Sequence, residues 1–137
     1  MQVDGSCHCG EIVFIAEVDP NSLTVCHCTD CQKMSGSAFR ANIRCPADKF
    51  RLIRGEPKIY VKVADSGARR AMAFCGDCGT QLYAYAAEGP STYSLRSGTL
   101  KQRSSFRPHR QIWLRSALPW TKDVLGAPSF ETEPPKT

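Results

Sequence analysis

Seven of the eight cysteines stand in three tight groups, and this spacing restricts the chain more than any other feature. The groups are Cys7 with Cys9, Cys26 with Cys28 and Cys31, and Cys75 with Cys78. Residues 1–5 lack the basic and apolar regions of a secretory signal, and no apolar run approaches the roughly 18 residues that a membrane span needs. We therefore expect a cytoplasmic chain with no membrane partner. Closely spaced thiols in a reducing compartment are typical metal ligands rather than disulfides.

The three groups predict one complete metal site and one incomplete site. Cys7, Cys9, Cys75 and Cys78 together supply the four ligands of a structural zinc, whereas three thiols leave a position for water or substrate. Spacing alone leaves other pairings open. The first pair could join Cys26 and Cys28, and the three-cysteine group could be completed by Cys45 or a histidine. Otherwise Cys45 is expected to be a half-buried thiol on a strand.

Local geometry favours sulfur over imidazole ligands. Side chains alternate in an extended segment, so each Cys-x-Cys pair places both thiols on one face while His8 and His27 point away. After Cys28, Thr29 or Asp30 is expected to cap a short helical turn through 32–34, ended by Gly36, which returns Cys31 to the first two thiols. Gly79 after the third group is typical of a zinc knuckle, because glycine lets backbone amides turn towards the sulfurs.

The rest of the chain predicts a mainly β protein with antiparallel sheets and little helix. At 137 residues it is long enough for one domain, which we place at residues 1–126. Proline and charged residues predict a loose tail at 127–137. Trp113 and Trp120 are expected to be core or rim aromatics. Strands are expected at 11–18, 23–25, 38–45, 50–53, 58–63, 70–74, 81–86, 92–95 and 111–114.

Charge argues weakly for an anionic partner. The formal net charge is +5, and thiolates bound to zinc would lower it to about +2, which makes nucleic acid an unlikely partner. The distribution is more informative, because residues 89–122 contain no carboxylate. The basic residues in or next to this stretch predict either a solvated face or an anion-binding one: Arg96, Lys101, Arg103, Arg107, Arg110, Arg115 and Lys122.

Four segments together resemble a known enzyme family. Residues 5–10, 26–39, 74–80 and 97–100 carry the cysteine groups with their neighbouring glycines, and they resemble the glutathione-dependent formaldehyde-activating enzyme family, which also includes the centromere protein V domain. The resemblance implies an Mss4-like fold. It implies a structural zinc on Cys7, Cys9, Cys75 and Cys78, and a second zinc on Cys26, Cys28 and Cys31 with an open fourth position.

The same resemblance implies a reaction. The family joins glutathione and formaldehyde to give S-hydroxymethylglutathione, which is a carbon–sulfur lyase reaction in the condensation direction. Three thiolates suit the capture of a soft fourth ligand such as a substrate thiol. Glutathione carries two carboxylates, which Arg40, Arg96 or Arg107 could bind, with His109 as a further candidate near the site.

Two other functions remain open at this point. A non-catalytic zinc module could use its basic residues to hold an acidic partner or nucleic acid, and an exposed three-thiol group could sense metal or oxidants. We expect a small thiol and an aldehyde as partners, and a monomer or a homodimer.

Overall fold

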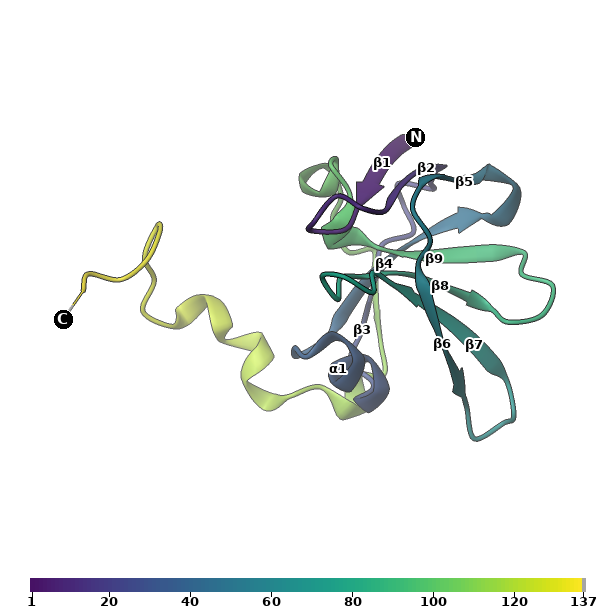
Figure 1. Cartoon of the computed structure of the whole chain (residues 1–137). Helices are drawn as coiled ribbons and strands as arrows, with labels where there is room; N and C mark the ends of the chain where they lie inside the picture. The colour runs from purple at the N-terminus through teal and green to yellow at the C-terminus, as the bar shows by residue number, and fades with distance from the viewer. Residues whose placement is uncertain (137) are drawn as a thin grey trace.

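The computed structural model describes residues 1–136 and has two β-sheets and one α-helix (Figure 1). The predicted mainly β fold is therefore confirmed. The elements are β1 (Gln2–Ser6), β2 (Val13–Glu17), β3 (Thr24–Cys26), α1 (Thr29–Ser35), β4 (Arg40–Pro46), β5 (Phe50–Arg54), β6 (Lys58–Val63), β7 (Arg69–Phe74), β8 (Gln81–Ala86), β9 (Thr92–Arg96) and β10 (Arg110–Ile112).

The two sheets differ in size and share no strand. The small sheet has the order β1-β2-β5, and the large sheet has the order β10-β3-β4-β9-β8-β7-β6. Neighbouring strands are antiparallel with one exception, because β10 runs parallel to β3. Parallel neighbours need a long connection. Here the chain between β3 and β10 crosses the whole large sheet before it returns to its edge.

Aromatic side chains fill the space between the sheets. Phe14 of β2 meets Tyr83 of β8 edge to face, with ring centroids 5.7 Å apart. Phe50 of β5 lies 4.6 Å from Tyr83 and 4.7 Å from Tyr93 of β9. Gly5 stands opposite Phe14 in the small sheet, and a side chain at Gly5 would overlap the phenyl ring. The two sheets thus pack through one shared core.

Several local predictions need correction. The strand Gln2–Ser6 was not expected, although its alternating burial places Val3 and Gly5 in the core. Cys45 is fully buried rather than half-buried, because it lies in the inter-sheet core opposite Tyr93. The last strand ends at Ile112 rather than at residue 114, since Trp113 adopts a left-handed backbone conformation.

The chain after β10 leaves the body of the molecule. Trp113 and Trp120, which were expected to be core or rim aromatics, are each about half exposed and so do not belong to the core. Short 3-10 turns occupy Leu114–Ser116, Pro119–Lys122 and Val124–Gly126, and the chain then leads away from both sheets (Figure 1). Thr137, the final residue of the predicted tail, lies outside the described residues. Nowhere between residues 1 and 136 does a helix combine the length and apolar character required to cross a bilayer.

Candidate metal centres and the adjoining cavity

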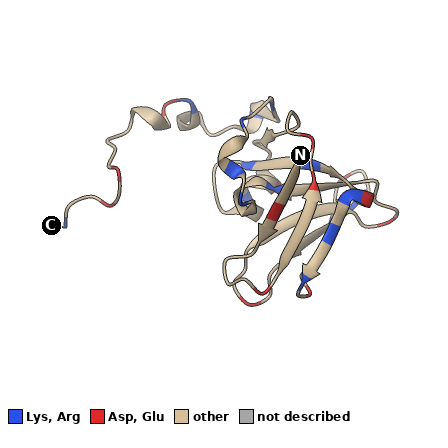
Figure 2. Ribbon diagram, turned by 90° about the horizontal axis from the view of Figure 1, so that it is seen from above, with Lys and Arg blue, Asp and Glu red and all other residues tan. Residues whose placement is uncertain are grey.

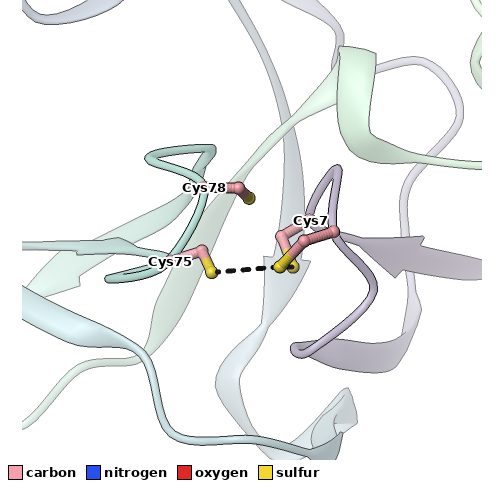
Figure 3. Close-up of side chains that lie close together, drawn as sticks. Cys7, Cys75 and Cys78 are labelled. Atoms are coloured by element: carbon pink, nitrogen blue, oxygen red, sulfur yellow. Dashed lines mark hydrogen bonds between the residues drawn. The ribbon is translucent and has the colours of Figure 1, made fainter.

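Four cysteine sulfurs meet between the two sheets. Cys7 and Cys9 lie in the turn after β1, and Cys75 and Cys78 lie in the turn between β7 and β8. The sulfur atoms all lie within 4.8 Å of one another. Figure 3 shows Cys7, Cys75 and Cys78 pointing towards a common centre from the two turns. Both thiols of the first pair reach this centre from a turn, so the predicted strand geometry is wrong while the convergence of their sulfurs stands.

The spacing of these sulfurs fits a tetrahedral zinc. Zinc–sulfur bonds of about 2.3 Å place neighbouring sulfurs about 3.8 Å apart. The Sγ atoms of Cys7 and Cys9 are 3.6 Å apart, and those of Cys9 and Cys75 are 3.7 Å apart. Backbone amides also turn towards the sulfurs: Ile12 donates to Cys7 at 3.3 Å and Asp77 to Cys75 at 3.4 Å. Amide donors stabilise thiolates, so this group has the chemistry and the shape of a structural metal site.

The other three cysteines converge beside helix α1. Cys26 ends β3, Cys28 is the N-cap of α1, and Cys31 lies in its first turn. Their sulfur atoms also lie within 4.8 Å of one another. The cap is made by a thiol rather than by Thr29 or Asp30, because the Cys31 amide donates to the Cys28 sulfur at 3.2 Å. The helix ends at Gly36 as predicted, with a left-handed residue whose amide closes the last turn.

His27 is held away from this group. The ring is buried, and its Nε2 lies 2.8 Å from Gln111 Oε1 on β10. Neither His27 nor His8 belongs to either cysteine cluster. Burial raises the pKa of the Cys31 thiol to about 12, although the Arg40 guanidinium acts in the opposite direction. A thiol in such surroundings gives up its proton when a metal cation binds it.

The outer face of the large sheet beneath α1 is rich in arginine. Cys26 stands opposite Arg40, and Asn42 stands opposite both Thr24 and Arg96, so these side chains share one face. Arg96 donates to Asn42 Oδ1 at 2.7 Å and reaches the Met72 sulfur on β7 at 3.5 Å. Helix α1 covers this face, because Asp30 at its start pairs with Lys62 of β6 at 2.8 Å.

Two of these arginines are buried without a negative partner. Arg40 and Arg96 are each only 7 % exposed, and no carboxylate of residues 1–136 lies within ion-pair distance of either. Burial, and then repulsion by Arg40, lowers the pKa of Arg96 to about 9. The same two causes lower the pKa of Arg70. A buried cation without a counter-ion is costly, so this cluster favours the binding of an anion.

A cavity of about 500 Å³ beside this cluster opens to solvent and lies between α1, β4 and the turn before β8. Arg40 and Arg96 line it together with Met34, Phe39 and Gln81. Two buried polar atoms at this cavity lack a hydrogen-bond partner, the Arg96 Nε donor and the Gln81 Oε1 acceptor. Buried polar groups are nearly always satisfied. The cavity therefore suits a ligand that carries both an anionic group and an N–H or O–H donor.

Comparison with known proteins identifies the family. The sequence model of the glutathione-dependent formaldehyde-activating enzyme family matches residues 2–116. The chain belongs to this family. A search of curated proteins finds no match. A crystal structure of a Rhodobacter sphaeroides protein is 18 % identical with a TM-score of 0.61, and the alignment covers 81 % of this chain and 99 % of that one. That likeness shows a shared fold.

Within this family domain, the residues predicted for substrate binding separate into two places. Arg40 and Arg96 line the cavity beside the three-cysteine group. His109 lines a different cavity with Asp19 and Arg44 near the start of β10. Arg107 is exposed on the segment before β10. The structure therefore brings Arg40 and Arg96, but neither Arg107 nor His109, to the cavity beside the cysteines.

Sequence reasoning missed three polar residues of this region. Arg70 and Lys62 come from β7 and β6, at the opposite edge of the large sheet from β3. The alternation of polar and apolar residues in Lys58–Val63 already indicated that Lys62 lies on the polar face of its strand. Nothing in the sequence indicated that helix α1 would cover that face. Gln81 follows the knuckle directly, and only its unpartnered oxygen at the cavity reveals its position.

Proposed function

We propose that this chain is a zinc-dependent carbon–sulfur lyase that acts on the adduct of an anionic small thiol and an aldehyde, with S-hydroxymethylglutathione as the leading candidate. The observation that supports this most directly is the pair of buried arginines, Arg40 and Arg96, without a carboxylate partner beside the three-cysteine group. Membership of the formaldehyde-activating family supports the reaction class.

The two cysteine clusters would have different tasks. Cys7, Cys9, Cys75 and Cys78 would hold a structural zinc, since four thiolates leave no ligand position free. Cys26, Cys28 and Cys31 would hold the second. A zinc with three thiolates supplies a position for the substrate thiol and keeps that thiol ionised near neutral pH.

The chain's own side chains would then position the substrate. Arg40 and Arg96 would bind a carboxylate through charge-assisted hydrogen bonds, and this contact would repay the cost of their burial. The Gln81 Oε1 atom would accept a hydrogen bond from an amide or ammonium group of the same ligand. A peptide thiol offers both groups, so glutathione fits this cavity better than a neutral thiol does.

The reaction needs orientation more than activation. Its carbon–sulfur bond forms between the thiol sulfur and the aldehyde carbon, and the aldehyde oxygen takes up the proton. Thiols and formaldehyde combine without a catalyst, so holding the thiol in one place supplies most of the possible rate gain. Phe39 and Met34 contribute apolar wall to the cavity and exclude water from one side of the ligand.

The decisive experiment compares Cys28→Ser with Cys45→Ser. Serine preserves the N-cap of α1, so Cys28→Ser removes one metal ligand with little effect on the helix. We expect about two zinc ions per wild-type chain and about one in Cys28→Ser. NMR exchange spectroscopy should show that S-hydroxymethylglutathione and glutathione interconvert at the uncatalysed rate in that variant.

Cys45→Ser is the matched control, because Cys45 is buried but belongs to neither cluster. It should retain both metals and accelerated exchange. Unchanged exchange in Cys28→Ser would refute the role of the three-cysteine group. Two bound metals without any acceleration in the wild type would favour a non-catalytic zinc module.

A further inference from the structure

The segment after β10 exposes a row of large apolar side chains. We call residues 117–136 the C-terminal arm. It begins after the end of the family match at residue 116 and leads away from both sheets in two views (Figures 1 and 2). Leu125 is 95 % exposed, and Trp120, Val124 and Phe130 are each more than half exposed. Isolated exposed apolar residues are ordinary, but a projecting segment that carries four of them indicates a docking element.

The accessible surface of the whole chain also supports a docking role for the arm. Its accessible surface is 9075 Å², whereas a compact monomer of 15.1 kDa is expected to expose about 7,100 Å². The excess of about 2,000 Å² is larger than the roughly 800 Å² that each partner contributes to a standard protein interface. The chain thus exposes enough extra surface for the arm to supply one side of a stable interface.

A second apolar group lies on the body of the same chain. Apart from Met1, Phe39 at the cavity beside the three-cysteine group, and the residues of the arm and its base, the exposed large apolar side chains among residues 1–136 all belong to β5 and β6. We call these residues of two consecutive strands the β5–β6 edge, and they are Leu52, Ile53, Ile59, Tyr60 and Val63. Both strands are edge strands, β5 in the small sheet and β6 in the large one. Exposed apolar edges are normally covered, because they invite pairing with other chains.

Position and charge indicate which partner fits. The arm starts beside β10, and β10 and β6 are the opposite edges of the large sheet, so the arm leads away from the β5–β6 edge of its own chain. Glu131 and Glu133 follow Phe130 in the arm, while Arg51, Arg54 and Lys58 flank the β5–β6 edge against one carboxylate, Glu56. An arm and its acceptor on one chain can close a twofold dimer.

We propose that the C-terminal arm docks on the β5–β6 edge of a second copy of this chain, and that two arms exchange reciprocally to form a homodimer. Leu125 and Phe130 supply the apolar contact, and the two glutamates meet the basic residues of the edge. This proposal does not depend on the reaction that the cysteine clusters carry out.

The test uses full-length, zinc-loaded protein and sedimentation velocity. We expect the wild type to be a dimer. The arm variant Leu125→Asp and the acceptor variant Val63→Asp should each raise the dimer dissociation constant at least about tenfold, the effect of losing one buried large apolar side chain. Both positions are exposed, so circular dichroism should show unchanged folding. Ser129→Asp is the matched control, because it adds the same charge to the arm without removing an apolar group.

Mixing the two variants tests reciprocal exchange directly. A reciprocal dimer has two arm–edge contacts, and a dimer of either variant alone has lost both. A mixed dimer keeps one intact contact. In it, the wild-type arm of the Val63→Asp chain docks on the wild-type edge of the Leu125→Asp chain. The mixture should therefore associate more tightly than either variant alone. Failure of the mixture to do so would overturn the proposal, as would a monomeric wild type. A monomer that sediments with phosphatidylcholine–phosphatidylglycerol vesicles would assign the arm to a lipid surface instead.

Discussion

The two cysteine clusters use the same ligand chemistry but occupy opposite structural situations. The four-cysteine cluster joins a turn after β1 of the small sheet to the β7–β8 turn of the large sheet, so its ligands are about 70 residues apart in the chain. The three-cysteine cluster lies within six residues around the start of α1, above two buried arginines. A metal in the first site would tie the sheets together, whereas a metal in the second would leave the fold largely as it is.

The largest expected effect is the loss of folding in Cys75→Ser. Structural zinc sites contribute about 10–16 kcal/mol at neutral pH, which is as large as the whole stability of a typical domain, about 5–15 kcal/mol. The variant should be unfolded by circular dichroism and should bind no metal at the four-cysteine site. Cys45→Ser controls for the loss of a buried thiol. A cooperative melt of Cys75→Ser at the wild-type temperature would break the comparison between the clusters.

The next largest effect is expected on metal removal, because the two clusters should lose their metals one after the other with different consequences for folding. Chelator should take the first metal from the three-cysteine group without change in circular dichroism, because only three nearby protein ligands hold it. Removal of the second metal should unfold the chain, since that site links two sheets. A chromogenic zinc indicator and circular dichroism recorded together test this order. Simultaneous release of both metals with unfolding would show that the sites are not independent.

The arginines beneath the three-cysteine cluster should affect affinity rather than folding. Arg96→Gln removes a charge-assisted hydrogen bond of about 1.5–3 kcal/mol, so KM for an anionic thiol should rise about 10- to 150-fold. KM for a neutral thiol should change little, and Tm should stay level or rise because a buried unpaired charge is gone. Arg44→Gln is the matched control, because Arg44 lies on β4 but is exposed. Equal losses with both thiols would contradict this role.

The smallest expected effect concerns the contact that holds α1 over the sheet. The hydrogen bond and charge of Lys62 lower the pKa of the Asp30 carboxyl, but Asp30 is largely exposed. Lys62→Met should therefore lower stability by less than about 1 kcal/mol. Denaturant titrations should show that the difference from wild type shrinks at high salt. A larger loss, accompanied by release of the metal of the three-cysteine group, would show that this pair supports the site.

Local patterns predicted much of the fold. Alternation of polar and apolar residues located β6 at 58–63 to the residue, because side-chain direction in a strand depends only on position along it, and the strand expected at 81–86 is β8. Gly36 marked the end of α1 for a similarly local reason, its left-handed backbone. β1 was missed because Gly5 and the polar residues around Val3 disguise a strand whose inward face is filled by Phe14 from its neighbour.

The sequence by itself determined the ligand types, their spacing and the family to which they point. Spacing alone left open whether Cys7 and Cys9 join Cys75 and Cys78, although the family resemblance implied this set. The structure shows how the four sulfurs meet, on two turns from different sheets. It also brings together Arg40, Arg70 and Arg96, which come from β4, β7 and β9. Residue spacing sets which way a side chain points within its own strand, whereas strand order depends on how the two sheets bury their shared core. That order brought two arginines to the cysteines and left His109 at another cavity.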